Sequence, residues 1–288
     1  MYKYLIIILF FNCSAFQVHE YFISMWQENY EGVPYEQIVY NVLKENPLKS
    51  GTNYLAVPWV YLIDREQLDK LDDVKIEGGF TVCGHWNYTK IIPALKKIGI
   101  NVLFTPHAHH DSYQGVKIIS IPHFAPNGTG PLDKDIYYSY IGASSHGVRN
   151  DLFKINNPAN CIIKLRQDWH FQLSGDSKLK QKEEYQNVLA RSRFSLCPRG
   201  AGHGTLRLWE SLQAGAIPVL LADEYILPPG FDWNKCLIRV DEHKANNIPE
   251  ILGQISIEQE KEMQKNCLKA FDLSSGSNII KVIKDYYE

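Results

Sequence analysis

The chain has 288 residues, of which 45% are hydrophobic and 22% charged, and its formal net charge is −2. These values are ordinary for a folded globular protein, and they exclude the strongly basic character of a nucleic-acid-binding domain. The six cysteines are scattered without any CxxC or CxxxC pair, which argues against a structural zinc site. Their even number leaves one or two disulfides open.

The amino terminus allows two interpretations. Lys3 precedes the apolar run 4–11, and small residues follow the run, as in a secretory signal. We favour a buried first strand, because the run contains three consecutive β-branched isoleucines. This interpretation favours a soluble cytoplasmic protein, whereas a signal over residues 1–15 would send the chain into the secretory pathway.

Apolar strand-like runs then alternate with helical patterns, which predicts α/β layers. In the first half we expect a helix over 90–98 and strands over 53–63 (interrupted by Pro58), 80–83, 101–104 and 116–121. The segment 125–135 contains two Pro and two Gly and is the expected linker between two domains. After it we expect strands over 137–141, 193–197, 217–222 and 237–240, and helices over 180–190, 205–213, 257–271 and 277–287.

The segment 191–223 is the most informative, because it reads as a strand, a glycine-rich loop, a helix and a second buried strand. Gly200, Gly202 and Gly204 allow the backbone to turn tightly and to approach a ligand. We expect the helix to begin near Thr205, whose hydroxyl can cap its first N–H groups. Helix N-termini of this kind attract anions, so the segment predicts a phosphate site.

Charged side chains surround the predicted phosphate site. Arg199 and Arg207 flank it, and guanidinium groups bind phosphate oxygens through paired hydrogen bonds. Glu210 can accept hydrogen bonds from a ribose, and Asp223 follows the next strand, where ligands of parallel sheets bind. The loop fits neither GxGxxG nor the Walker pattern, so these residues predict a phosphate-bearing ligand, with a nucleotide as the leading choice.

The run 185–228 spells YxxxLxxSRFxLCPRGxGxxTxRLxExLxAGxIPVxLxDxxxLP, which resembles the core of exostosin-type glycosyltransferases. Residues 140–142 and 148–152 are similar to the FxG…R..L segment of that family. The resemblance covers about 136–252 and is weak in the first half of the chain.

The resemblance implies a GT-B type α/β fold, in which two Rossmann-like domains face a cleft. We accordingly expect an N-terminal acceptor-side domain over 1–135 and a C-terminal nucleotide-sugar-binding domain over 136–256. Two C-terminal helices within 257–288 should pack back on the N-terminal domain. The chain is also shorter than animal exostosins, so we expect no transmembrane anchor.

The implied activity is an inverting transfer from a UDP-sugar to a hydroxyl of an oligosaccharide or glycoprotein acceptor. The UDP-sugar is a co-substrate, no cofactor or metal is required, and no nucleic-acid partner is expected. A neutral sugar such as xylose, galactose or glucose is favoured, because no second basic group for a uronic acid stands out. Carried over by position, the residues around the diphosphate are Arg149, Arg199, Gly200, Gly202, Thr205 and Arg207, with Glu210 at the ribose.

An inverting transfer needs a general base on the acceptor side, which should come from the first domain. Six polar residues follow its predicted strands: His85, His107, His109, His110, Asp111 and His123. We select His85 and Asp111 as candidates, with His107 as the third. A metal held by the central histidines lacks a ligand geometry that can be defended.

The sequence also contains a DxD motif at 133–135, which is the metal-binding pattern of a different glycosyltransferase architecture. Its place in the linker favours a solvated turn. Two other functions stay open: a GT-B transferase that uses a GDP-sugar, and a catalytically inactive protein that binds a sugar nucleotide or a glycan.

Overall fold

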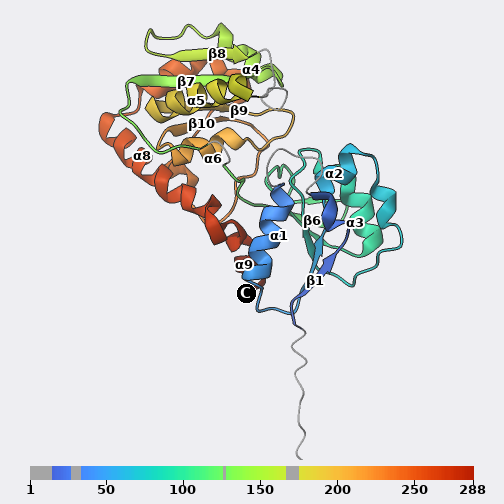
Figure 1. Cartoon of the computed structure of the whole chain (residues 1–288). Coiled ribbons are helices and arrows are strands. Elements are labelled where there is room, and N and C mark those ends of the chain that lie inside the picture. Colours follow the sequence, from blue (N-terminus) through green and yellow to red (C-terminus); the bar gives the residue numbers. More distant parts are fainter. Residues whose placement is uncertain (1–14, 27–33, 126–127, 167–174) are drawn as a thin grey trace, which may run out of the picture.

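The computed structural model describes residues 15–26, 34–125, 128–166 and 175–288, and Figure 1 shows that they form two lobes. Each lobe is an α/β domain built on a mainly parallel sheet. The predicted α/β fold with two Rossmann-like domains, which is the GT-B arrangement, is thereby confirmed. The predicted strand over 4–11 lies outside the described residues.

The N-terminal domain contains a six-stranded sheet in the order β1-β2-β3-β4-β6-β5, and only the β5–β6 pair is antiparallel. Its strands are β1 (Gln17–Glu20), β2 (Asn53–Ala56), β3 (Phe80–Val82), β4 (Val102–Thr105), β5 (Ser112–Tyr113) and β6 (Val116–Ser120). Its α-helices are α1 (Tyr35–Glu45), α2 (Trp59–Asp64) and α3 (Ile92–Ile98).

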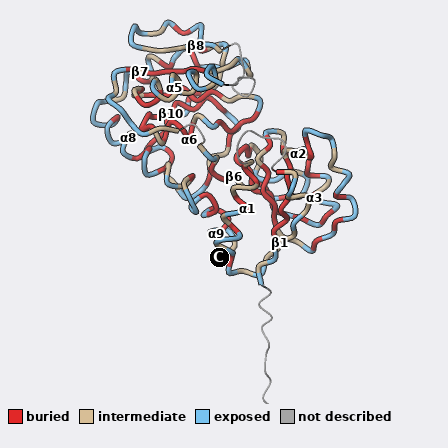
Figure 2. Tube along the Cα trace, in the orientation of Figure 1, coloured by how far each residue is buried: buried red, intermediate tan, exposed pale blue. Residues whose placement is uncertain are grey.

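Both faces of this sheet are buried, as Figure 2 shows by the buried colour along its strands. Successive residues of a strand point to opposite faces, so Leu55 joins the core that contains residues of α2 and α3. Its neighbours Tyr54 and Ala56 join the core on the α1 side. Helices on both faces explain why the strands are almost continuously apolar.

The expected strand over 53–63 is wrong in its second half. β2 ends at Ala56, and α2 begins at Trp59 directly after Pro58. A proline at a helix start costs nothing, because the first N–H groups of a helix have no partner in any case. The fully buried Trp59 then donates its indole N–H to Thr81 Oγ1 at 2.7 Å, which ties α2 to β3.

The C-terminal domain contains a parallel sheet in the order β11-β10-β9-β7-β8. Its strands are β7 (Ile136–Ala143), β8 (Ile162–Arg166), β9 (Ser192–Pro198), β10 (Ile217–Leu221) and β11 (Ile238–Arg239). Its α-helices are α4 (Gly147–Asp151), α5 (Gly175–Arg191), α6 (Leu206–Gln213) and α7 (Ile248–Gly253), and α8 (Ile257–Phe271) packs against α6.

The DxD motif has a structural role in the linker. Lys134 Nζ donates to the carbonyl oxygens of Ala190 and Ala214, at 2.7 and 2.6 Å, at the ends of α5 and α6. Asp135 forms an ion pair with Arg191. Through these contacts the motif fastens the linker to the C-terminal domain.

The last two α-helices pack on different domains. Cys267 and Ala270 of α8 join the core of the C-terminal domain, whereas α9 (Lys281–Tyr287) contributes Ile283 to the N-terminal core. We expected all of 257–288 to return to the N-terminal domain, and in the structure the part that does so begins after α8. Figure 1 shows α8 running from one lobe toward α9, which lies beside α1.

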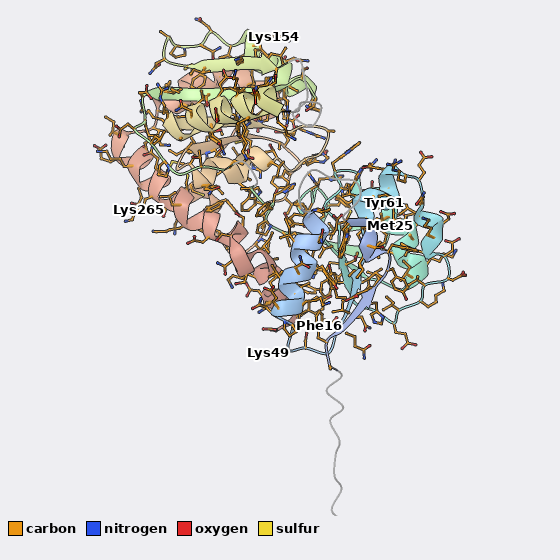
Figure 3. The ribbon with its side chains drawn as sticks, in the orientation of Figure 1. Phe16, Met25, Lys49, Tyr61, Lys154 and Lys265 are labelled. Atoms are coloured by element: carbon orange, nitrogen blue, oxygen red, sulfur yellow. The ribbon has the colours of Figure 1, made fainter. Side chains whose placement is uncertain are left out.

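Exposed lysines lie on both lobes, and Figure 3 labels Lys154 and Lys265 on the C-terminal lobe and Lys49 on the N-terminal lobe. None of the described helices combines the length and the apolar character that crossing a membrane requires. The five described cysteines are all free thiols, so none of them forms a disulfide within the chain.

Candidate functional site

Guanidinium groups gather at the carboxyl ends of β7 and β9. Arg149 of α4 donates from Nε to the carbonyl of Arg199 at 2.9 Å and from Nη1 to the carbonyl of Ala143 at 3.1 Å. Arg207 of α6 donates from Nη2 to the carbonyl of Ile141. The fold therefore brings the guanidinium groups of Arg149 and Arg207 together beside the backbone of Arg199, although the three residues are 50 and 8 positions apart in the sequence. We call them, with Arg166, the arginine cluster.

Arg207 is held between two tyrosine rings. Its guanidinium carbon lies 4.7 Å from the centre of the Tyr140 ring and 4.9 Å from that of Tyr185, which are distances of favourable cation–π contacts. The Tyr185 hydroxyl donates to Glu210 Oε2 at 2.5 Å. Burial and the nearby Glu210 carboxylate raise the pKa of Tyr185 well above its ordinary value, so this hydroxyl keeps its proton. Glu210 lies beside the cluster as expected, and its contact with a ribose stays a prediction.

The start of α6 has unsatisfied donors. Thr205 occupies the N-cap position with extended backbone, yet its hydroxyl makes no capping hydrogen bond, so the expected side-chain cap is wrong. By contrast, Ser256 caps α8 by accepting from the backbone N–H of Gln259. Near α6, Arg199 Nε is buried and has no hydrogen-bond partner in the described part of the chain. A bound anion would satisfy both kinds of donor.

The glycines of the loop serve close packing rather than a tight turn. None of Gly200, Gly202 and Gly204 has a positive φ. A Cβ at Gly200 would lie 2.9 Å from Arg149 Nη2, so this glycine leaves room for the guanidinium. A Cβ at Gly202 would lie 2.8 Å from Nδ1 of His107, and one at Gly204 only 2.1 Å from the carbonyl oxygen of Pro106. The loop thus lies directly against the N-terminal domain.

Arg166, at the carboxyl end of β8, is a member of the cluster that was not predicted from the sequence. It is paired in register with Ala143 of β7, and its Nη2 donates to Gln181 O at 2.6 Å and to Glu184 Oε2 at 3.2 Å. The sequence feature that could have indicated it is an arginine at the last position of a short, strand-like apolar segment. Because its charge is paired with Glu184, Arg166 adds less free positive charge than the other three arginines.

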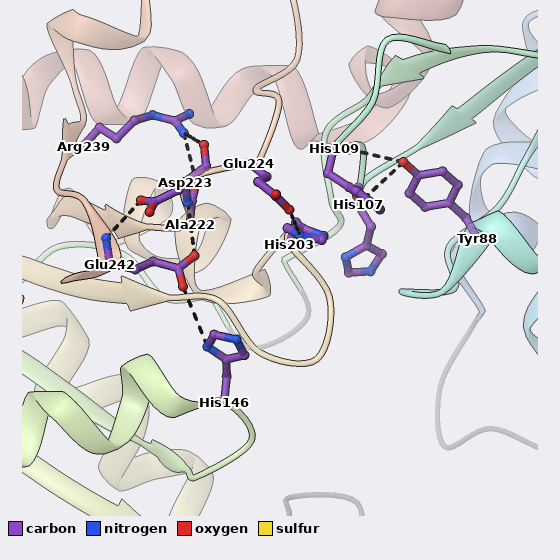
Figure 4. Close-up of polar contacts among 10 residues, drawn as sticks. All are labelled: Tyr88, His107, His109, His146, His203, Ala222, Asp223, Glu224, Arg239 and Glu242. Atoms are coloured by element: carbon purple, nitrogen blue, oxygen red, sulfur yellow. Dashed lines mark hydrogen bonds and ion pairs between the residues drawn. The ribbon is translucent and has the colours of Figure 1, made fainter. Parts of the chain in front are cut away.

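Asp223 belongs to a different polar group, at the end of β10. Its Oδ1 accepts from the backbone N–H of Glu242 at 3.0 Å, and its own N–H donates to Glu242 Oε1 at 3.2 Å. Figure 4 shows this pair together with His146, which lies 4.0 Å from the Glu242 carboxylate. In the described part of the chain, the side chain of Asp223 therefore bonds within this group and not with the arginine cluster.

The first candidate base, His85, has both ring nitrogens engaged. Nε2 lies 3.1 Å from Asp64 Oδ1, and Nδ1 accepts from the backbone N–H of Asn87 at 3.0 Å. Because a carboxylate only accepts, Nε2 carries the hydrogen and Nδ1 uses its lone pair on the loop. Burial lowers the pKa of His85. His85 thus fixes the loop that presents Trp86, whose side chain is 47% exposed.

The other two candidates lie in different places. Asp111 is exposed and directly precedes β5, where its carbonyl accepts from the N–H of Ile118 at the edge of the sheet. His107 is buried against the glycine-rich loop, and its Nδ1 has no partner in the described residues. Burial, followed by the nearby His123, holds the pKa of His107 well below its usual range. Of the two, only His107 reaches the junction between the domains.

Another histidine at this junction was not predicted, because the base was sought in the first domain alone. His203 lies in the glycine-rich loop, and its ring stacks on that of His109 with the centres 4.0 Å apart. Its Nε2 lies 2.9 Å from Oε2 of Glu224. Nearby, the N–H of Ile226 donates to the carbonyl of Ala108 at 2.9 Å. The molecule also has two shallow surface hollows, one beside Lys90 and one beside Arg193, and neither is lined by His203 or His109.

Comparison with known proteins places the arginine cluster and the glycine-rich loop in a known domain. Residues 141–255 match the exostosin GT47 domain. The exostosin-1 homolog of Caenorhabditis elegans is 32% identical over 157 residues, which cover 51% of this chain and 41% of that protein. Human exostosin-2 is 39% identical over 116 residues, which cover 40% of this chain and 15% of that protein. The chain therefore spans less than half the length of these relatives.

Solved structures resemble the chain only distantly. A glycosyltransferase from Rickettsia africae has a TM-score of 0.42 and 9% identity, covering 95% of this chain and 96% of that one. The GtfA/B complex has a TM-score of 0.41 and 12% identity, covering 88% of this chain and 60% of that one. The fold assignment rests on the two parallel sheets and not on these scores. The domain match and the curated relatives agree that residues 141–255 are similar to the GT47 domain of exostosin glycosyltransferases.

Proposed function

We propose that this chain transfers a sugar from a UDP-sugar, with inversion at the anomeric carbon, to a hydroxyl of a glycan acceptor. The observation that supports it most is the set of unsatisfied donors at the start of α6, where the helix has no side-chain cap and Arg199 Nε is buried without a partner. These donors lie inside the segment that matches the exostosin GT47 domain. The diphosphate of a nucleotide sugar would satisfy them.

In this proposal the donor diphosphate lies between α6 and the end of β7. Arg149, Arg199 and Arg207 provide guanidinium donors, and Gly200 lets the Arg149 guanidinium lie directly against the glycine-rich loop. Negative charge grows on the leaving phosphate as its bond to the sugar breaks. Guanidinium groups that the fold already holds near this position would stabilise that charge, so we propose a transfer that does not depend on a metal.

The pairing within the cluster favours a neutral donor sugar. Three arginines serve the phosphates in this proposal, and Arg166 is already paired with Glu184. Because Glu184 partly neutralises Arg166, the cluster offers less positive charge to the carboxylate of a uronic acid. Xylose, galactose and glucose are the sugars to test first.

Calorimetric titration of the purified chain with UDP and with GDP tests the nucleotide. We expect UDP to bind more tightly, and hydrolysis of one sugar from a panel of UDP-sugars to release UDP. Tighter binding of GDP would favour the GDP-sugar alternative. UDP binding without hydrolysis or transfer of any sugar would favour an inactive binding protein, and binding of neither nucleotide would contradict the proposal.

A further inference from the structure

His203 occupies the centre of the glycine-rich loop, two residues before the N-cap of α6. A sugar attached to phosphates at the start of α6 would therefore lie close to this side chain. Figure 4 shows Glu224 and His203 extending from the C-terminal domain toward His109 and His107 of the N-terminal domain. His203 thus lies where the donor side and the acceptor side of the molecule meet.

The hydrogen bond to Glu224 determines which ring nitrogen of His203 can accept a proton. Nε2 lies 2.9 Å from Glu224 Oε2, and a carboxylate only accepts, so Nε2 carries the hydrogen of the neutral ring. Nδ1 then presents a lone pair, and no hydrogen bond among the described residues engages it. The stacked ring of His109 holds the imidazole in place. An imidazole oriented by a carboxylate is the arrangement of a general base.

The three bases expected from the sequence are less suitable in this geometry. His85 uses both nitrogens within its own loop, and His107 Nδ1 is buried under the glycine-rich loop. Asp111 lies at the exposed edge of the sheet. The His203 side chain is 11% exposed, which keeps it fixed and still accessible.

We propose that Nδ1 of His203 is the general base of the transfer and that Glu224 orients it, a proposal that rests on the proposed function. The acceptor hydroxyl gives its proton to Nδ1 while its oxygen forms a bond to the anomeric carbon. At the same time the bond from that carbon to the phosphate oxygen breaks, and UDP leaves with the electron pair. The resulting imidazolium pairs with the Glu224 carboxylate until its proton passes to solvent.

The charges around His203 agree with this role. Burial, followed by Arg199 and His109, lowers the pKa of His203 to about 4, whereas Glu224 acts in the opposite direction. His107 also faces His203, and its own burial keeps it neutral. The free enzyme therefore holds His203 unprotonated and ready to accept. A bound diphosphate would offset the charge of Arg199 and raise this pKa toward the range in which a base is effective.

The test compares His203→Ala, His203→Gln and Glu224→Gln with the wild-type chain, using the UDP-sugar that the wild type hydrolyses or transfers. Loss of the base should lower kcat by about 10²- to 10⁴-fold. UDP affinity, measured by calorimetry, should stay within about threefold, since His203 makes no phosphate contact in this proposal. Added imidazole should restore part of the activity of His203→Ala but not of His203→Gln, because only alanine leaves space for it.

Glu224→Gln should reduce kcat less than loss of His203. Removing the carboxylate lowers the pKa of His203, so the acid limb of the kcat/KM profile should move to lower pH. His243→Gln, at an exposed histidine of the same domain, is the matched control and should match the wild type. Full kcat in His203→Ala, or a loss of UDP affinity equal to the loss of kcat/KM, would overturn the proposal. Failure of the wild type to bind UDP would instead overturn the proposed function.

Discussion

The two sides of the domain junction differ in the kind of charge that they contain. On the C-terminal side, Arg149, Arg199 and Arg207 are guanidinium groups, which stay charged at any pH that a protein tolerates. On the N-terminal side, burial keeps the polar groups neutral: it lowers the pKa of His123 to about 4 and raises that of Glu36 to about 7. The comparison indicates that the arginines keep their charge as the pH changes, whereas the buried groups of the acceptor side titrate.

Glu36 shows how burial in the N-terminal domain creates a group that titrates near neutral pH. Its side chain on α1 is 1% exposed, and its Oε1 accepts from the backbone N–H of Gly84 at 3.0 Å and of Val60 at 3.4 Å. These hydrogen bonds favour the carboxylate, but the cost of burial is larger, and the pKa rises. The carboxyl group therefore anchors the loop that contains His85 and Trp86 at the junction.

The largest expected effect concerns stability as a function of pH. Glu36 ionises near 4.5 in the unfolded chain and near 7 in the folded one, so the unfolded state holds fewer protons between these values. The free energy of unfolding should then fall as the pH rises through this range, by about 3 kcal/mol from this group. Buried histidines with lowered pKa contribute a change of the opposite sign, so the informative quantity is the difference between the wild type and Glu36→Gln.

Urea denaturation of both proteins at pH 5 and pH 8 measures this difference. Relative to the wild type, Glu36→Gln should gain stability between the two pH values by up to about 3 kcal/mol. Glu45→Gln changes an exposed carboxyl group on the same helix and should give no such gain. An identical pH dependence in the wild type and Glu36→Gln would show that Glu36 does not titrate in this range.

The second prediction tests the fixed-charge side. Arg199→Ala removes the buried Nε donor, and the loss of charged hydrogen bonds should weaken UDP binding by about 1.5 to 3 kcal/mol, or roughly 10- to 150-fold. Calorimetry at pH 8, where the terminal phosphate of UDP is fully ionised, measures this loss. Arg191→Ala removes an arginine that pairs with Asp135 outside the cluster, and its UDP affinity should equal that of the wild type. Equal losses in both variants would argue against a specific phosphate contact.

The smallest expected effect is a loss of stability when the packing of the glycine-rich loop against the N-terminal domain is disturbed. In Gly204→Ala the added methyl group would meet the backbone carbonyl of Pro106 at 2.1 Å, so the loop must move away from the N-terminal domain. Overpacking of this kind costs about 1 to 3 kcal/mol, which thermal unfolding should detect. Gly253→Ala adds a methyl group where nothing lies within 4 Å, and its stability should stay close to that of the wild type. A stable Gly204→Ala with unchanged kcat would show that the two domains can move apart at this loop without consequence.

The sequence by itself determined the α/β fold, the strand–loop–helix–strand order of 191–223 and the similarity of that segment to the exostosin GT47 domain. These follow from local signals: apolar runs of strand length, glycine and proline at the ends of elements, and a long specific motif. Local patterns could not show that Trp59 begins a helix, because the apolar run continues through Pro58. They also missed β8, whose exposed edge gives it a weaker apolar pattern.

Only the tertiary structure decided which charged residues meet. Arg166 joins Arg207 because β8 lies beside β7 in a parallel sheet, and no local pattern specifies that neighbour. Gly202 and Gly204 are required by the approach of the N-terminal domain and not by their own backbone angles. His203 faces His109 across 94 positions of sequence for the same reason. Contacts between distant segments depend on how whole layers pack, and a sequence pattern records only the residues that one element buries.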